Sequence, residues 1–167
     1  MENNSISVRD SRIYGFVVLY DMHTDFLKRA LDGITDGAAQ SRLDTQANHI
    51  TWLTGSLVQQ RFEFSNCFGS EMQQTSHELF SNNQVIKSHF EYPPLADFIT
   101  DWERISPVLR ERLIELDTSE LDKEIDMGEM KMSYFDWLSF LIYREANIIG
   151  QIALWRRLLG YPALKYD

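Results

Sequence analysis

The 167 residues carry a formal net charge of −9, and 44% of them are hydrophobic. This composition is that of an ordinary globular domain and excludes a disordered or fibrous chain, while the acidic balance argues against nucleic acid, whose binding needs clustered Lys and Arg. The single cysteine, Cys67, permits no internal disulfide and fits a reducing compartment, and no apolar stretch is long enough to span a bilayer. We therefore expect one cytoplasmic domain over residues 1–167 that binds neither nucleic acid nor membrane.

Two helices are predicted in the first 70 residues. Apolar residues between positions 13 and 34 recur at spacings of three, four and seven, which predicts a helix from about residue 11 to residue 31. Asp10 or Ser11 can cap its start, and Gly33 follows its end. A second apolar stripe predicts a helix over about residues 38–67, which Gly69 ends; the stripe consists of Leu43, Ala47, Ile50, Leu57 and Phe64.

A third helix is predicted after a polar, irregular connection over residues 70–94. It begins after Pro93 and Pro94, and its apolar residues remain in helical register as far as Leu116. Pro107 interrupts this pattern. Either the helix is kinked there, or Ser106 caps a new helix that has Pro107 at its first position.

The fourth helix follows an acidic connection over residues 117–132, which we expect to be a loop. Ser133 and Asp136 resemble a capping box, and Gly160 and Pro162 close the helix after Leu159. Four helices with short to medium connections predict an all-α fold, a four-helix bundle with room for one or two short extra helices. Its predicted core contains Val17, Tyr20, Ile50, Leu57, Trp102, Leu109, Leu141 and Ile152.

Two segments are more distinctive than the composition: residues 48–58, NHITWLTGSLV, and residues 143–152, YREANIIGQI, which are followed by RRLLG at 156–160. In order and spacing they resemble the DinB/YfiT-like superfamily, bacterial four-helix bundles that are often described as metalloenzymes. The first segment is similar to that family's Asn-His-x-x-Trp-x-x-Gly-His-Leu stretch. The second is similar to its His-Glu-x-Tyr-His-x-Gly-Gln-Ile stretch.

The resemblance implies a metal site, and this chain departs from it. In the family three histidines usually bind a divalent metal, and their positions fall here on Ser56, Arg144 and Ile148. A hydroxyl, a permanent cation and an alkyl group do not make a zinc site. In an alternative alignment His49 is the ligand of the second helix. His23, His77 and His89 have no ligand-like spacing, and we expect them to lie at the surface or to bond locally.

These residues predict a binding or interaction module without metal or other cofactor. Its small-molecule pocket would lie between the second and fourth helices, and the pocket candidates are His49, Ser56, Arg144, Ile148 and Gln151. Arg144 lies on a mostly apolar stripe, so we expect a carboxylate or a solvent anion to pair with it. The alternative function, which the resemblance implies, is metal-dependent transfer of low-molecular-weight thiols to small electrophiles. We also expect a homodimer, because the fourth helix is apolar on several sides and many family members dimerise.

Overall fold

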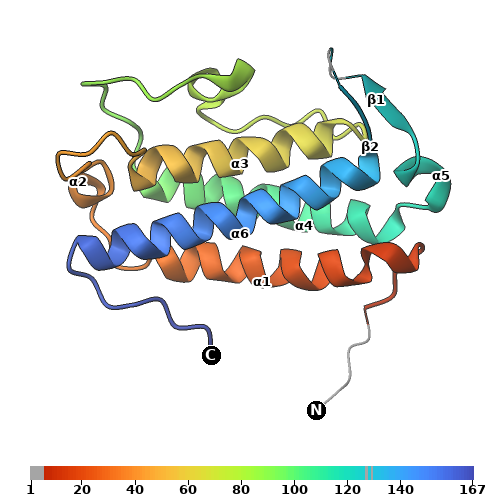
Figure 1. Cartoon of the computed structure of the whole chain (residues 1–167), viewed down its shortest axis with the longest axis horizontal. Helices are drawn as coiled ribbons and strands as arrows, with labels where there is room; N and C mark the ends of the chain where they lie inside the picture. Colours follow the sequence, from red (N-terminus) through yellow and green to blue (C-terminus); the bar gives the residue numbers. More distant parts are fainter. Residues whose placement is uncertain (1–5, 127, 129) are drawn as a thin grey trace.

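Four long helices make up most of the computed structural model, which describes residues 6–126, 128 and 130–167 (Figure 1). The helices are α1 (Tyr14–Leu31), α3 (Ile50–Asn66), α4 (Leu95–Glu115) and α6 (Tyr134–Leu158). They lie side by side; α1 packs against α4 and α6, and α3 packs against the same two helices. The expectation of a mostly helical, all-α fold is confirmed. Within the described residues, no helix is both long and apolar enough to cross a membrane.

The prediction of the second helix, over residues 38–67, is wrong in its first half. A four-residue helix, α2 (Asp36–Ala39), is followed by a loop, and α3 begins only at Ile50. Leu43 and Asp44 have φ angles of 46° and 58°, a left-handed conformation that ends any helix. Leu43 is 44% exposed, so it does not belong to the buried stripe that continues through Ile50.

The alternatives at Pro107 are resolved in favour of one helix. α4 runs without interruption from Leu95 to Glu115, with Pro107 inside it. Ser106 does not cap a new helix, because its hydroxyl is buried and donates to the carbonyl oxygen of Trp102 one turn earlier. The capping box at the start of α6 is confirmed, since Ser133 and Asp136 each accept from the other's backbone N–H.

The acidic connection is more ordered than expected. It contains a short helix, α5 (Thr118–Leu121), and an antiparallel pair of strands, β1 (Glu124–Asp126) and β2 (Lys131–Ser133), in which Ile125 pairs with Met132. Strands of three residues are too short for an alternating pattern to show in the sequence. Residues 127 and 129 of this connection lie outside the described residues.

The remaining connection, residues 67–94, is named here the cover segment. It contains two short 3-10 helices, η2 (His77–Leu79) and η3 (Ser81–Asn83); a third, η1 (Ser11–Ile13), precedes α1. In Figure 1 the cover segment runs along α3, above it in this view. It therefore shields a face of α3 that no other long helix covers.

The core is divided into two apolar clusters. One surrounds Leu57 and Trp102, and the other surrounds Val17 and Leu109. All eight predicted core residues are confirmed, since each is at most 1% exposed. Between the two clusters lies a layer of buried polar side chains, described below.

Candidate functional site

A cavity of about 460 Å³ lies between α3, α6 and the cover segment. Six apolar or aromatic side chains form one part of its wall: Trp52, Phe80, Val85, Ile86, Trp137 and Phe140. The other lining residues are polar or charged: Asn48, Ser56, Gln59, Gln60, Glu63, Asn83, Gln84 and Arg144. The volume falls within the range of small-molecule sites, and the lining is more polar than is usual for them.

Arg144 is the cationic group of this cavity. Its Nη2 donates to Ser56 Oγ over 2.7 Å, and its Nη1 donates to Gln60 Oε1. The side chain is half-buried, and this burial lowers the pKa of the guanidinium although the Glu63 and Glu145 charges oppose the shift. The guanidinium stays charged at neutral pH in proteins, so the cavity presents a fixed positive charge.

The partners of Arg144 among the described residues are neutral. We expected either a carboxylate or a solvent anion beside it; no Asp or Glu of the described residues forms an ion pair with Arg144, so the carboxylate alternative is wrong, and the solvent anion stays a prediction. Hydroxyl and amide oxygens solvate the cation without neutralising it. The charge therefore remains available to an anion that enters the cavity.

Ser56 and Arg144 are brought together, but the other three pocket candidates are not with them. His49 is the N-cap of α3, where its Nδ1 accepts from the N–H of Trp52 over 3.1 Å. Ile148 is 5% exposed and belongs to the apolar core. Gln151 is exposed, and its amide donates to Asn147 on the same helix. None of the three lines the cavity.

Two residues that line the cavity carry a buried donor that has no partner among the residues described by the structure. The donors are Nε1 of Trp52 and Nε2 of Gln60, and Gln60 as a whole is only 7% exposed. A buried N–H without an acceptor costs about 1–3 kcal/mol. Both atoms are buried, so they lie behind the surface of the cavity and not on it.

The cover segment is attached to α3 at Gly55. Nε2 of Gln74 donates to the carbonyl oxygen of Gly55 over 3.2 Å and to Gln59 Oε1 over 2.7 Å. The ring of Phe80 packs so closely against Gly55 that a Cβ atom on residue 55 would lie 2.1 Å from Cζ of the ring. The absence of a side chain at this position thus allows Phe80 to form the wall of the cavity.

The metal positions implied by the resemblance do not fit a metal here. Arg144 repels a cation, Ser56 is engaged as its acceptor, and Ile148 is packed in the core. Among the residues that the structure describes, no group of three or more His, Cys, Asp and Glu side chains could hold an ion. His49 does not replace them, because its Nδ1 is used by the helix cap.

A buried ionic cluster, which the sequence reasoning missed, joins all four long helices. Nε and Nη2 of Arg61 in α3 donate to both carboxylate oxygens of Glu145 in α6, over 2.6 and 2.9 Å. Nη1 of Arg61 donates to the hydroxyls of Thr24 in α1 and Ser106 in α4, over 2.8 and 2.7 Å. His23, expected at the surface or in a local bond, is instead buried and lies 3.1 Å from Glu145.

Two aromatic rings enclose the guanidinium of this cluster. Its Cζ lies 3.7 Å from the ring centre of Tyr20 and 3.4 Å from that of Trp102. Burial alone would raise the pKa of Glu145, but Arg61 and His23 hold it below its usual value. All three nitrogens of the Arg61 guanidinium are engaged and both charges are fully buried, so the cluster stabilises the fold and is not an open site.

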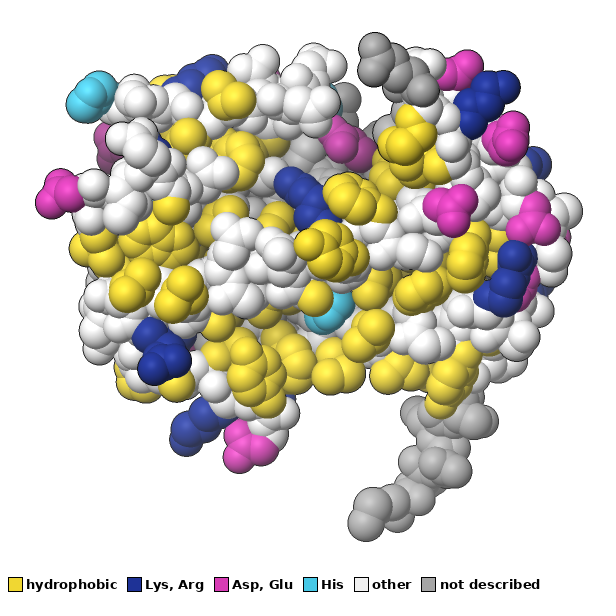
Figure 2. All heavy atoms as spheres, in the orientation of Figure 1, with side chains coloured by type: hydrophobic (Ala, Val, Ile, Leu, Met, Phe, Trp, Pro, Cys, Tyr) yellow, Lys and Arg dark blue, Asp and Glu magenta, His cyan; other side chains and the backbone are white. Residues whose placement is uncertain are grey.

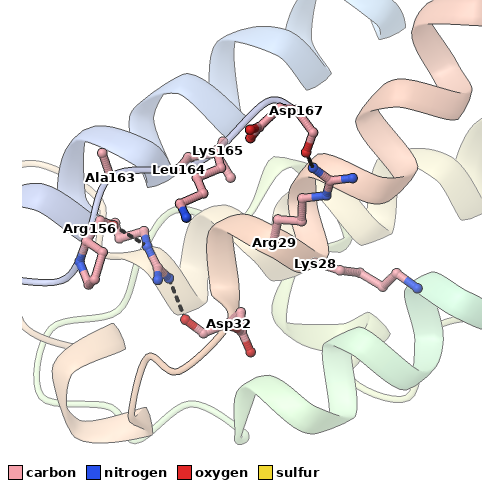
Figure 3. Close-up of a pocket in the computed structure, with 9 residues that line it drawn as sticks. Lys28, Arg29, Asp32, Arg156, Ala163, Leu164, Lys165 and Asp167 are labelled. Carbon is pink, nitrogen blue, oxygen red and sulfur yellow. Dashed lines mark hydrogen bonds between the residues drawn. The ribbon is translucent and has the colours of Figure 1, made fainter.

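A second cavity, of about 540 Å³, lies beside the C-terminal ends of α1 and α6 (Figure 3). Two of its basic side chains, Arg29 and Arg156, already have partners. Arg156 donates to the carbonyl oxygens of Ala30, Asp32 and Pro162, and Arg29 donates to that of Asp167 over 2.6 Å. Cations at helix C-termini stabilise the exposed carbonyl groups, so these residues complete the ends of the helices.

The buried cap His49 predicts a dependence of stability on pH. Burial, with the charge of Arg42, lowers the pKa of His49 from 6.5 to about 4. Between these values the unfolded chain binds more protons than the folded chain, so stability rises with pH. Lowering the pH from 7 to 5 should cost about 1 kcal/mol of unfolding free energy through this group, measured by urea denaturation.

The control for this effect is His49→Asn, which keeps a capping side chain but does not titrate. Its unfolding free energy should fall less between pH 7 and pH 5 than that of the parent. Equal losses in the two proteins would show that His49 does not carry the effect.

No family model matches this chain, and no curated protein is significantly similar to it.

Proposed function

We propose that the chain is a small-molecule binding module, without metal-dependent activity, that holds an anionic group at Arg144. One observation carries this proposal: a half-buried guanidinium, whose partners among the described residues are all neutral, lines the cavity. An anion that enters the cavity would receive hydrogen bonds from this group. Charge-assisted hydrogen bonds of this kind are the stronger ones in proteins.

We further propose that the chain is a DinB/YfiT-like protein of a bacterial cytoplasm whose metal ligands have been replaced. The order and spacing of the motifs at 48–58 and 143–160 support this assignment, as does the packing of four long helices. The donor set at Ser56, Arg144 and Ile148 supports the loss of the metal. Function depends on the site and not on the fold. The residues that line the cavity are therefore a better guide to the function of this chain than the activity of the family.

Binding of a simple aromatic carboxylate tests the proposal. We expect 3-phenylpropionate to change the tryptophan fluorescence of the protein, because Trp52 and Trp137 line the cavity. Arg144→Gln should weaken this binding about 10- to 100-fold, since a hydrogen bond to a charged group contributes about 1.5–3 kcal/mol. Calorimetric titration gives the affinities.

The matched control is Arg157→Gln, which removes the same charge from an exposed position on the same helix. It should bind the probe like the parent; equal weakening in both variants would indicate a general charge effect and contradict the proposal. Stoichiometric zinc, nickel or iron in protein purified without chelators would refute the loss of the metal site. That result would favour the alternative, metal-dependent thiol transfer.

We propose in addition that the protein is a homodimer. Large apolar side chains gather on the outer face of α6 and the adjoining face of α1, on the side shown in Figure 2: Leu19, Met22, Phe140, Tyr143, Leu154 and Leu158, each at least 39% exposed. Exposed apolar patches of this kind mark interaction surfaces.

Light scattering should give a mass of twice 19.6 kDa for the parent protein. Leu154→Glu should halve that mass, whereas Leu43→Glu should not. A parent mass near 19.6 kDa would contradict the proposal.

A further inference from the structure

Opposite charges lie side by side in the cavity. Among the described residues that line it, Arg144 is the cation and Glu63 is the carboxylate. Ser56, Gln60 and Glu63 follow one another at spacings of four and three, so they share one face of α3. Because Arg144 bonds to Ser56 and Gln60, the Glu63 carboxylate lies at about the next turn of the helix, some 4–5 Å further along its axis.

The two charges do not neutralise each other by direct contact. In the described part of the chain Arg144 and Glu63 form no ion pair, and Oε1 of Glu63 instead accepts from Nε2 of Gln59 over 2.9 Å. The carboxylate of Glu63 nevertheless acts on Arg144, since its charge raises the pKa of the guanidinium against the effect of burial. One wall of the cavity thus presents a positive end and a negative end one helical turn apart.

This charge pattern discriminates between anions. A ligand with two negative charges, such as phosphate, would gain from Arg144 but would be repelled by Glu63. A carboxylate that carries an ammonium group two bonds away would satisfy both ends. The apolar wall of the cavity would accept the hydrophobic body of such a ligand.

We propose that the cavity binds a free α-amino acid with an aromatic or large aliphatic side chain. Its carboxylate lies on Arg144, its ammonium group faces Glu63, and its side chain packs among the six apolar residues of the wall. This inference rests on the proposed function, anion binding at Arg144, and specifies the chemical class of the ligand.

Three probes of similar shape test the carboxylate and the ammonium group of the ligand separately. L-phenylalanine has both groups, 3-phenylpropionate lacks the ammonium group, and 2-phenylethylamine lacks the carboxylate. We expect L-phenylalanine to bind the full-length protein about 2- to 5-fold more tightly than 3-phenylpropionate, the range for a partly exposed ion pair. 2-Phenylethylamine and inorganic phosphate should bind more weakly than either.

Substitution of the carboxylate assigns the difference to Glu63. Glu63→Gln should remove the preference for L-phenylalanine while leaving the affinity for 3-phenylpropionate equal or higher. Glu78→Gln removes an exposed carboxylate of the cover segment that does not line the cavity, and it should leave both affinities unchanged. Thermal unfolding of both variants shows whether they remain folded, and Glu63→Asp should retain part of the preference.

The outcomes distinguish this inference from the proposed function. If 3-phenylpropionate binds through Arg144 but L-phenylalanine binds no more tightly, the amino-acid inference is wrong and the anion site stands. Tighter binding of phosphate than of L-phenylalanine would overturn the inference in the same way. If no carboxylate probe binds, or if Arg144→Gln has no effect, both are wrong.

Discussion

Glu145→Ala should lower the free energy of unfolding by about 3–5 kcal/mol, the cost of leaving a buried charge without its partner. Arg61 is fully buried, and its guanidinium cannot reach solvent to replace the lost carboxylate. Urea denaturation followed by circular dichroism measures the change. Glu111→Ala, an exposed position on α4, should stay within about 0.5 kcal/mol of the parent.

A paired substitution keeps this prediction testable if the single variant does not fold. Arg61→Met combined with Glu145→Leu removes both charges and fills the same space. It should be clearly more stable than Glu145→Ala, because replacing a buried ion pair by apolar side chains is often neutral or stabilising. A double variant as unstable as the single one would mean that shape, and not charge, determines the loss.

Leu57→Ala should cost about 2–5 kcal/mol of unfolding free energy, since it removes a completely buried side chain from the core of α3. The neighbouring residue supplies the control. Ser56→Ala leaves the core intact and removes only one acceptor of the half-buried Arg144, so it should cost about 1 kcal/mol or less. Equal losses at the two positions would contradict the assignment of the buried face.

The long helices and the core could be predicted because apolar periodicity follows burial directly. Three of the four main stripes, and the second one from Ile50 onward, lie on buried helix faces. The capping box at Ser133 is a local signal that packing does not override. The loop before α3 could not be predicted in this way. Leu43 stands at a helical spacing from Ala47 and Ile50, yet its left-handed backbone depends on the loop as a whole.

The candidate site was predicted in part, for a physical reason. Aligning two helices by resemblance located the contact between Ser56 and Arg144, because both side chains lie at the α3–α6 interface. The same alignment placed Ile148 beside them, but the long side chain of Arg144 extends out of the stripe while Ile148 points into the core. No pattern in the sequence indicated that the cover segment forms part of the cavity wall, since irregular segments carry no periodicity.

The buried ionic cluster did leave a signal in the sequence. Arg61 stands four residues after Leu57 and three before Phe64, which places it on the buried stripe of α3. Glu145 has the same relation to Leu141 and Ile148 on α6. Two opposite charges on the core stripes of two helices predict a buried pair, because neither could be buried alone.

The adjacent positions of Arg144 and Glu145 limit how this chain can change in length. The first bonds to Ser56 and Gln60, and the second bonds to Arg61, so two neighbouring residues of α6 are matched to one short stretch of α3. Inserting one residue within residues 56–61 would rotate the parts of α3 by about 100° relative to each other. Either the cavity or the ionic cluster would then lose its partners. Insertions and deletions should therefore be excluded from the middle of α3.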